Sequence, residues 1–380
     1  MVSKKLLQHK IVRTFEIRYF VIHCAQIANI KGSKAMHAQK IVRPDEKSPV
    51  FMDAMVIKKF GRCDVFEKTS LPKPRPARHE VLIRVRSTSI NPIDVKIRNG
   101  SADIFAPAFP AILHGDVAGV IEDLGPDVPN FEKGQEVYGC VGGVTGQSGT
   151  LAEYVVADAS LIARKPKNID FPSAGSIPLV AITAWEALID RANLQEGQRV
   201  LIHGGLGGVG HVAIQIAKSR GAVVHTTVSS EEGMPIVHEL GADAAINYRE
   251  EPVADYVQRL TGSEGYDIVL DTVGGENLER SFSAARVGGT VVTLQGLGKI
   301  DLSQAGVKGL TLHAVLMLLP MLTGKGRRHH GQILHDIAKL VEDGRVRIMI
   351  GKKFCGLERI SEAHAYFESG GGRGKVSLEF

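Results

Sequence analysis

The sequence predicts an α/β protein of two domains, one built on a doubly wound parallel sheet and one with an antiparallel, barrel-like fold. From residue 198 onward, short β-rich runs alternate with helical periods, which is typical of parallel strands joined by crossover helices. Residues 54–163 instead read as short strands separated by Pro and Gly. After about residue 325, a helix, a short strand, another helix and a strand at 376–379 indicate that the chain returns to the first domain.

The individual elements follow from local patterns. In the first domain, strands are expected at 54–60, 80–89, 119–125, 136–139 and 151–157. In the second domain, β-rich runs predict strands at 199–203, 223–228, 244–247, 267–271 and 290–294. Apolar residues at helical spacing predict crossover helices at 209–219, 232–240, 253–260 and 276–285.

The composition is that of an ordinary soluble protein with a sizeable core, since 44% of the 380 residues are apolar and 23% are charged. The longest apolar run, 310–322, contains Pro320 and is shorter than the roughly twenty residues of a membrane helix. No membrane segment is therefore expected. The four cysteines lie far apart, which offers neither a disulfide framework nor a zinc-finger spacing and favours the cytoplasm. They are Cys24, Cys63, Cys140 and Cys355.

The net charge of +5 comes from residues 1–51, which hold ten Lys or Arg and three acids. The rest of the chain has 36 of the 46 basic and 38 of the 41 acidic residues, and this balance argues against nucleic-acid binding by the folded domains. The basic arm is expected to be a disordered extension, or sequence upstream of a start at Met36, Met52 or Met55. A mitochondrial presequence is the alternative.

The strongest motif is a glycine-rich turn between the strand expected at 199–203 and the helix that follows it. Gly205, Gly207 and Gly210 form the pattern G-x-G-x-x-G, with Gly208 and Val209 between them. Glycines permit a tight turn, so that backbone N–H groups and the helix dipole can approach a diphosphate. Although such turns also serve only to reverse a chain, this one has the strand and helix of a dinucleotide site.

The second strand of the parallel sheet ends at Ser229 and Ser230. An acid at this place selects NAD through the ribose 2′-hydroxyl, whereas small polar residues leave room for a 2′-phosphate. The sequence therefore favours NADPH over NAD. Glu231 and Glu232 follow immediately, and they keep NAD open even though acids also stabilise the first turn of a helix.

Several separated segments resemble one family, the zinc-lacking quinone oxidoreductase (zeta-crystallin-like) branch of the medium-chain dehydrogenase/reductases. The resemblance implies a Rossmann domain at 176–322 and a GroES-like, barrel-like substrate domain built from both chain ends, 52–175 and 323–380. It also implies a cleft between the two domains and a homodimer. The matching segments are Asn91-Pro-Ile-Asp94, Leu113-His-Gly-Asp-Val-Ala-Gly119, Val137-Tyr-Gly139, Ile182-Thr-Ala-Trp185, the glycine turn, Asp271-Thr-Val-Gly-Gly275 and Gly374-Lys375-Val376.

The resemblance also implies site residues. Asn91 would lie beside the nicotinamide ribose and the substrate, where its amide could donate to a developing enolate oxygen. As structural alternatives, Asn91 would cap a turn and Thr183 would begin a helix. For the other residues that the resemblance implies, the structural alternative is that they form ordinary strand ends or a flexible loop. The remaining residues that the resemblance places near the coenzyme are Thr183, Tyr248, Gly274, Leu294, Gly296 and Lys375.

No metal site is expected. Zinc-dependent relatives place a cysteine shortly before a conserved Asp and a histidine in G-H-E, because zinc needs thiolate and imidazole ligands. Here the segment from Asn91 to Asp94 has no cysteine, Gly115 stands at the histidine position, and His114 comes one residue early. The interpretation of His114 as a structural histidine is preferred to a metal pair with Cys140.

Three departures from the family pattern bear on coenzyme binding and mechanism. Gly233 stands where the family often carries a lysine that contacts the 2′-phosphate, and Leu206 replaces a small residue of the glycine turn. Lys96 stands where some relatives carry a tyrosine that can donate a proton. Water or Lys96 would then protonate the product, the latter being a hypothesis that requires burial to lower the pKa of its ammonium group.

The sequence thus predicts an NADPH-dependent reductase that passes a hydride to a quinone or an α,β-unsaturated carbonyl compound without a metal. Two alternatives remain. The first is an alcohol dehydrogenase of the same superfamily. The second is a non-catalytic NADPH-binding protein that acts on RNA or a protein partner through the basic arm.

Overall fold

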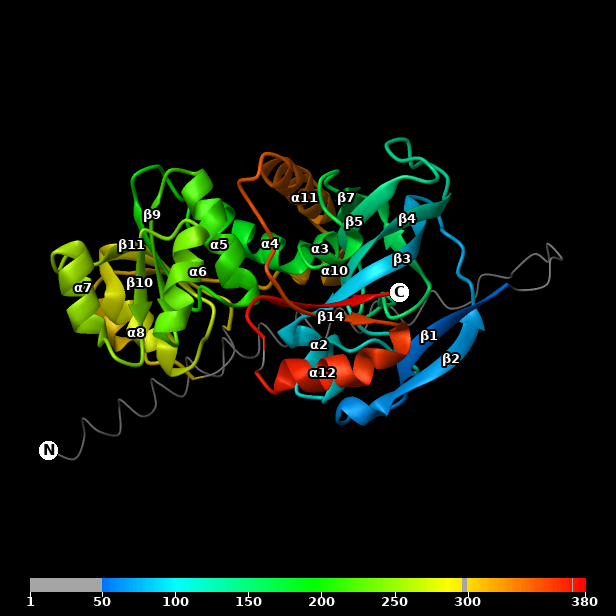
Figure 1. Cartoon of the computed structure of the whole chain (residues 1–380), viewed down its shortest axis with the longest axis horizontal. Helices are drawn as coiled ribbons and strands as arrows, with labels where there is room; N and C mark the ends of the chain where they lie inside the picture. Colours follow the sequence, from blue (N-terminus) through cyan, green and yellow to red (C-terminus); the bar gives the residue numbers. More distant parts are fainter. Residues whose placement is uncertain (1–49, 296–298, 371) are drawn as a thin grey trace, which may run out of the picture. The chain divides into compact units, whose positions relative to one another are not determined.

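The structure, a computed structural model, describes residues 50–295, 299–370 and 372–380. Residues Val50–Phe380 form one unit that contains two large sheets (Figure 1). The first strand begins at Phe51, so the basic arm predicted over 1–51 lies outside the described residues except for its last two positions. The predicted coenzyme residue Gly296 also lies outside them.

A six-stranded parallel sheet contains the predicted second set of strands. The strand order is β10-β9-β8-β11-β12-β13. The strands β9 and β10 lie on one side of β8, and β11, β12 and β13 lie on its other side, as in a doubly wound Rossmann fold. The structure therefore confirms the predicted fold class. β12 starts earlier than predicted, because residues 286–288 are exposed and Gly288 and Gly289 interrupt the apolar pattern. The strands are β8 (Arg199–Ile202), β9 (Val223–Val228), β10 (Ala244–Asn247), β11 (Tyr266–Asp271), β12 (Ala285–Thr293) and β13 (Thr311–Ala314).

Crossover helices connect these strands. The apolar residues of α5 are buried, among them Val212, Ile216 and Ala217, because they repeat at helical spacing on one face. The α7 helix ends at Gly262, whose left-handed conformation (φ of +62°) stops the helix. The elements are α5 (Gly208–Ser219), the 3₁₀ turn η5 (Glu231–Gly233), α6 (Met234–Glu239), α7 (Val253–Thr261), α8 (Glu276–Ala284) and α9 (Ser303–Val307).

A second, mainly antiparallel sheet combines both ends of Val50–Phe380. The last strand, β15, pairs antiparallel with β3, and β14 pairs parallel with β15. The C-terminal segment therefore returns to the first domain, as predicted. The strands are β3 (Glu80–Ile90), β4 (Asp116–Leu124), β5 (Glu136–Cys140), β6 (Tyr154–Asp158), β7 (Ile162–Arg164), β14 (Ile350–Cys355) and β15 (Lys375–Glu379). Beside it, β1 (Phe51–Ile57) and β2 (Phe66–Pro72) form a separate antiparallel pair.

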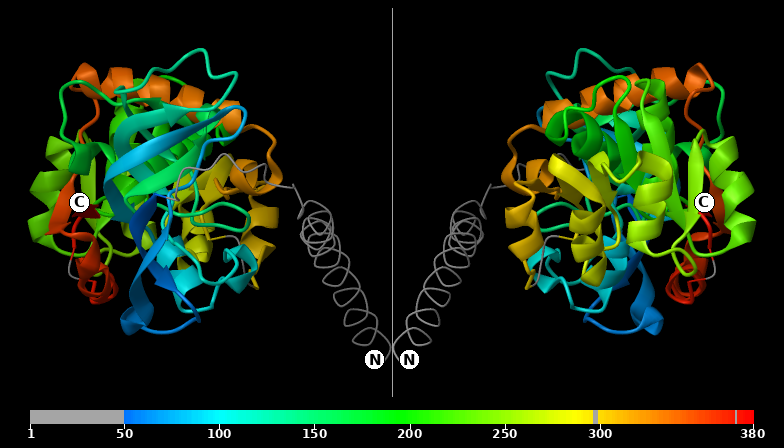
Figure 2. Two further views of the ribbon diagram at one scale, coloured as in Figure 1. Left: turned by 90° about the vertical axis from the view of Figure 1, so that its right-hand side faces the viewer. Right: turned by 90° about the vertical axis from the view of Figure 1, so that its left-hand side faces the viewer.

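Helices and 3₁₀ turns complete the fold around the antiparallel sheet. Figures 1 and 2 show α11 (orange) running beside β7 and α4. The Tyr138 hydroxyl of β5 donates to the Leu334 carbonyl of this helix at 2.5 Å. The elements are η1 (Cys63–Val65), α2 (Pro92–Arg98), η2 (Asp103–Phe105), η3 (Ala159–Leu161), α3 (Phe171–Ala174), α4 (Pro178–Trp185), a π-helical turn η4 (Glu186–Arg191), α10 (Leu319–Thr323), α11 (Arg327–Glu342), η6 (Leu357–Arg359) and α12 (Ile360–Glu368).

Within the described residues, one helical stretch is long and apolar enough to cross a membrane by length and composition. This stretch, Phe171–Arg191, has a mean hydropathy of 1.2 in its most apolar window, and 78% of that window is buried inside the protein. Because the neighbouring sheets and α5 cover it, the stretch is accounted for as a core helix.

Two buried histidines face each other between β3, β4 and α12. The Nε2 atoms of His114 and His364 lie 2.9 Å apart, and both residues are fully buried. The ring of Phe66 packs 4.9 Å from that of His364. Burial lowers the pKa of His114 to about 3 and places the pKa of His364 well below its usual value. The pair is therefore neutral in the folded protein at physiological pH.

We expect this pair to make the protein acid-sensitive. The folded pKa values lie below the unfolded value of about 6.5, so the unfolded chain takes up protons first, and each histidine costs about 1.4 kcal/mol of stability per pH unit below 6.5. Replacing His364→Phe should reduce this loss, although it also removes the contact with His114. Denaturant unfolding at pH 7.5 and pH 5 measures the difference, and His335→Gln on the exposed side of α11 is the control. Equal acid losses in wild type and His364→Phe would contradict the expectation.

Candidate functional site at the domain junction

The glycine turn connects β8 to α5 at the carboxyl edge of the parallel sheet. A Cβ on Gly210 would lie 2.1 Å from the Gly204 carbonyl oxygen, and one on Gly205 would lie 2.3 Å from the Thr226 hydroxyl. Gly207 is the N-cap of α5 and places no side chain over its first turn. The turn therefore requires glycines and leaves the N–H groups of a twelve-residue helix facing outward, where they can bind a diphosphate.

The other predicted coenzyme residues follow the ends of neighbouring parallel strands. Ser229 and Ser230 follow β9, Tyr248 follows β10, Gly274 follows β11 and Leu294 follows β12. Parallel strands end at one edge of their sheet, so these residues share the edge that carries the glycine turn. Tyr248 is 47% exposed and Ser229 is exposed, whereas Ser230 and Leu294 are half-buried.

Asp271 is a residue of this edge whose role the sequence did not reveal. Its carboxylate accepts hydrogen bonds from the Gly274 N–H at 3.0 Å, from the Asn277 amide at 2.8 Å and from the Thr293 hydroxyl at 3.0 Å. It thereby fixes the ends of β11 and β12 beside each other. The sequence signal that could have identified Asp271 is its position as the first residue of the motif Asp271-Thr-Val-Gly-Gly275.

Two departures from the family pattern pack against each other. Gly233 is buried, and a Cβ at this position would lie 2.7 Å from Cδ1 of Leu206. Leu206 is half-buried and packs against the apolar core. The leucine of the glycine turn thus occupies the space in which a side chain at residue 233 would begin. The two departures are structurally coupled.

A buried polar cluster on the antiparallel sheet lies next to the glycine turn. Asn91, Asp116 and Lys375 are each at most 3% exposed. The Asn91 amide donates to Asp116 at 2.8 Å, and the Lys375 ammonium donates to the Asn91 side-chain oxygen and to the Ile90 carbonyl. The Lys375 ammonium is also 3.6 Å from the Asp116 carboxylate. The sequence placed Asn91 and Lys375 at the coenzyme but did not identify Asp116, which joins them.

Burial shifts the pKa values of Lys375 and of the neighbouring Asp94. It lowers the pKa of Lys375, although the carboxylates of Asp116 and Asp94 oppose the change. It raises the pKa of Asp94 to about 7, while the N–H of Asn91, which donates to that carboxylate at 2.7 Å, opposes the rise. Shifted groups of this kind gather at functional sites, so the cluster is a candidate for proton exchange near the coenzyme.

The cluster and the glycine turn are in direct contact. A Cβ on Gly208 would lie 3.4 Å from Cδ of Lys375. The N–H of Gly374 donates to the Leu206 carbonyl at 2.8 Å. His211 in α5 links the same segments, because it lies 2.8 Å from the Gly207 carbonyl and accepts from the Met349 N–H at 3.1 Å. The predicted coenzyme turn and the predicted substrate domain thus meet at these residues.

Thr183 and Lys96 lie on elements that face this junction. The Thr183 hydroxyl donates to the Leu179 carbonyl within α4 at 2.7 Å, and the Leu179 N–H donates to Asp116 at 2.8 Å. Lys96 in α2 donates from its ammonium group to the side chain of Gln295, directly after Leu294, at 2.9 Å. Lys96 therefore connects α2 to the end of β12. No local sequence pattern pointed to Gln295 as a partner of Lys96.

The residues that the sequence offered as possible metal ligands pack against other side chains. A Cβ on Gly115 would lie 2.9 Å from Sγ of Cys140, and this buried thiol lies 3.9 Å from Sδ of Met321. His114 faces His364 instead of Cys140. Among the described residues, no group of three or more His, Cys, Asp or Glu side chains is arranged to hold a metal ion.

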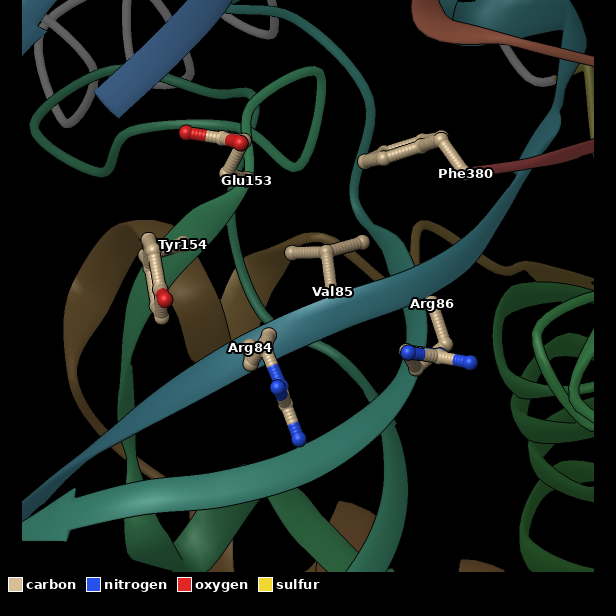
Figure 3. Close-up of a pocket in the computed structure, with 6 residues that line it drawn as sticks. All are labelled: Arg84, Val85, Arg86, Glu153, Tyr154 and Phe380. Atoms are coloured by element: carbon tan, nitrogen blue, oxygen red, sulfur yellow. The ribbon is translucent and has the colours of Figure 1, made fainter.

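A surface pocket lies elsewhere, on the antiparallel sheet. Figure 3 shows its lining side chains around β3 and the start of β6. None of them belongs to the predicted site, so this pocket is not the candidate coenzyme site. The lining residues are Arg84, Val85, Arg86, Glu153, Tyr154 and Phe380.

Comparison with known protein families supports the assignment of the fold. Residues 77–167 match the alcohol dehydrogenase GroES-like domain, and residues 240–378 match the zinc-binding dehydrogenase family. Human NAD(P)H oxidoreductase RTN4IP1, mitochondrial, is 33% identical, and the match covers 91% of this chain and 94% of that protein. Human quinone oxidoreductase is 31% identical, with coverages of 86% and 97%.

Solved structures show the same architecture. A crystal structure of an alcohol dehydrogenase superfamily protein from Novosphingobium aromaticivorans has a TM-score of 0.81 and 37% identity, and the match covers 87% of this chain and 100% of that one. Mycobacterial Rv1454c complexed with NADPH has a TM-score of 0.76 and 26% identity, with the same coverages.

The fold, the glycine turn and these relatives define the class of protein, an oxidoreductase with a nicotinamide coenzyme site. The chain belongs to the medium-chain dehydrogenase/reductase superfamily and, within it, to the quinone oxidoreductase branch. The resemblance found in the sequence is thereby confirmed.

Proposed function

We propose that this chain is an NADPH-dependent reductase that transfers a hydride to a quinone or an α,β-unsaturated carbonyl compound without a metal ion. The observation that carries the proposal is the contact between the glycine turn and the cluster of Asn91, Asp116 and Lys375 at Gly208. A dinucleotide held at the turn would bring its reactive end to the side of the junction where the substrate domain contributes polar groups.

The residues present fit the coenzyme. The glycine turn would hold the diphosphate, because a Cβ at Gly205 or Gly210 would fill space that backbone atoms and Thr226 already occupy. Bound NADPH supplies the hydride. Ser229 and Ser230 would leave room for the 2′-phosphate, and the relative crystallised with NADPH supports this choice. Lys375 and Asn91 would fix the polar end of the site, since each is held by two or more buried partners.

The metal-free part of the proposal rests on the ligand set. Gly115 stands where a zinc-dependent relative has its histidine, and Cys140 and His114 are engaged with other side chains. Activation of the acceptor must then come from the conjugation of the substrate itself, which quinones and enones possess. An alcohol dehydrogenase activity would require three or four metal ligands that the described residues do not bring together.

Titration of the purified full chain with NADPH and NADH, followed by an oxidation screen with quinones, enones, aldehydes and alcohols, tests the proposal. We expect tighter binding of NADPH and turnover with quinones or enones that a chelator leaves unchanged. Absence of binding to either coenzyme would overturn the proposal. Bound zinc together with loss of activity on chelation would establish an alcohol dehydrogenase instead.

The alternative of a non-catalytic binding protein has its own test. Removal of residues 1–49 leaves β1 intact, because that strand begins at Phe51. An enzyme should keep its turnover after this truncation, whereas a protein that binds RNA or a partner through the basic arm should lose that binding. A full chain that binds the coenzyme without any turnover, and that loses RNA or partner binding on truncation, would contradict the enzymatic proposal.

Lys96 is the proposed side-chain source of the proton that completes the reduction. Its ammonium group lies at the junction and donates to Gln295. We expect Lys96→Met to lower kcat about tenfold to a hundredfold, within the usual contribution of a positioned acid, and to leave NADPH affinity within about twofold. Steady-state kinetics with a quinone or enone identified in the screen measures both. Full turnover in Lys96→Met would assign protonation to water.

The proposed compartment is the cytoplasm and the proposed assembly is a homodimer. The human relative RTN4IP1 carries the word mitochondrial in its name, and a presequence is the alternative role of the basic arm. Imaging of the full chain with a C-terminal fluorescent tag distinguishes the compartments. Light scattering of the purified protein measures its oligomeric state.

A further inference from the structure

The helix α2 presents Lys96 to the end of β12 from a fixed backbone. At the start of the helix, the backbone N–H of Asn91 donates to the buried Asp94 carboxylate at 2.7 Å. At its last residue, the Arg98 guanidinium is buried and donates to Glu368 of α12 at 2.7 Å. Lys96 lies between these two anchors and is half-buried. Because the backbone is held on both sides of it, only the lysine side chain remains to be placed.

A single glutamine holds that side chain. An ammonium group has three N–H donors, and the ammonium of Lys96 donates to Oε1 of Gln295 at 2.9 Å. Within residues 50–295, 299–370 and 372–380, no carboxylate pairs with this ammonium group and no second acceptor bonds to it. The remaining donors can therefore reach a substrate oxygen, and the group that holds the lysine carries no charge.

Gln295 is in turn fixed to the parallel sheet. Its backbone N–H donates to the Thr293 hydroxyl at 3.2 Å, and this hydroxyl donates to the buried Asp271 carboxylate at 3.0 Å. Its Cβ occupies the space in which a side chain of Gly274 would begin, since a Cβ on Gly274 would lie 2.3 Å away. The glutamine thus belongs to the ends of β11 and β12, and it ties Lys96 to the edge that carries the glycine turn.

We propose that Gln295 is a positioning residue for Lys96, whose neutral side-chain oxygen aims the ammonium group without opposing the release of its proton. This inference rests on the proposed function, in which Lys96 completes the reduction. In that step one ammonium N–H bond breaks, an O–H bond forms on the anionic oxygen of the reduced substrate, and the resulting amine takes up a proton from water. A carboxylate in place of the amide would stabilise the charged ammonium and oppose the transfer.

The first test compares Gln295→Leu and Gln295→Glu with wild type by steady-state kinetics as a function of pH. Each should lower kcat about tenfold and leave the substrate KM and the NADPH affinity within about twofold. A donor that has lost its proton limits the rate at high pH, so Gln295→Glu should move this limb of the profile to higher pH and Gln295→Leu to lower pH. Gln258→Glu, at an exposed glutamine of α7, is the matched control and should leave both kcat and the profile unchanged.

A measurement without substrate or coenzyme tests the contact itself. Only the neutral amine of a lysine reacts with acetic anhydride, so the rate at which Lys96 is acetylated, followed by mass spectrometry, reports its protonation. We expect slower acetylation in Gln295→Glu, faster acetylation in Gln295→Leu and the wild-type rate in Gln258→Glu. The double variant Lys96→Met/Gln295→Leu should have the same kcat as Lys96→Met, because Gln295 acts through Lys96.

The outcomes separate this inference from the proposed function. Unchanged kcat, pH profile and acetylation rate in both Gln295 variants would overturn the role of Gln295 and leave the reductase proposal standing. Full turnover in Lys96→Met would also overturn it, since no side-chain donor would remain to be positioned. A loss in Gln295→Leu that recurs in full on top of Lys96→Met would show a purely structural role. If wild type binds neither coenzyme, the proposed function and this inference are both wrong.

Discussion

Replacing Gly210→Ala is expected to weaken coenzyme binding strongly and to destabilise the fold. The new methyl group would lie 2.1 Å from the Gly204 carbonyl oxygen and 3.0 Å from Cα of Gly205, so the backbone of the turn has to move. Such strain typically costs about 2–4 kcal/mol. Displacement of the N–H groups at the start of α5 should weaken NADPH binding on the order of a hundredfold, which corresponds to about 2.7 kcal/mol.

The matched control is Gly306→Ala in α9, where a Cβ would meet open space. Alanine favours a helix over glycine by up to about 1 kcal/mol, so this variant should be as stable as wild type or more stable. Denaturant unfolding and coenzyme titration of both variants provide the measurements. A Gly210→Ala protein that binds NADPH as tightly as Gly306→Ala would show that the turn does not hold the diphosphate.

Replacing Lys375→Met is expected to destabilise the protein more than any exposed lysine substitution. The Asp116 carboxylate is fully buried, and the Lys375 ammonium at 3.6 Å is its cationic partner. Removing one member of a buried ion pair typically costs about 3–5 kcal/mol, because the remaining charge is uncompensated. The loss of the contact beside Gly208 should also weaken coenzyme binding. Denaturant unfolding at pH 7.5 measures the first effect.

Lys353→Met on the neighbouring strand β14 is the control for Lys375→Met. Lys353 lies 3.0 Å from Asp170, but both side chains are about half exposed, so its removal should cost at most about 1 kcal/mol. The second substitution Asp116→Asn should recover part of the loss in Lys375→Met, because it removes the uncompensated charge. Equal stabilities of the two lysine variants would contradict the assignment of a buried charge pair.

Most of the parallel sheet could be predicted from sequence, because its strands and helices carry strong local patterns. The β-branched run of β9 and the apolar face of α5 match the structure within one residue at each end. The antiparallel strands were harder to predict. β2, which forms a separate pair with β1, was missed because most of its residues are exposed and it lacks the apolar alternation of a core strand.

The candidate site was predictable in part. Gly205 and Gly210 could be identified from sequence, because a tight turn directly between a strand and a helix requires glycine. Asp116 and Gln295 carry no such local signal, since their roles depend on partners far away in sequence, Lys375 and Lys96.

The sequence by itself determined the fold class, the dinucleotide turn and the family, because these depend on patterns within one strand, one turn and one helix. The tertiary structure alone decided which charges are buried together and which segments of the two chain ends meet at Gly208. The physical reason is that burial and ion pairing depend on distance in space, and a chain that returns to its first sheet brings residues almost three hundred positions apart into contact.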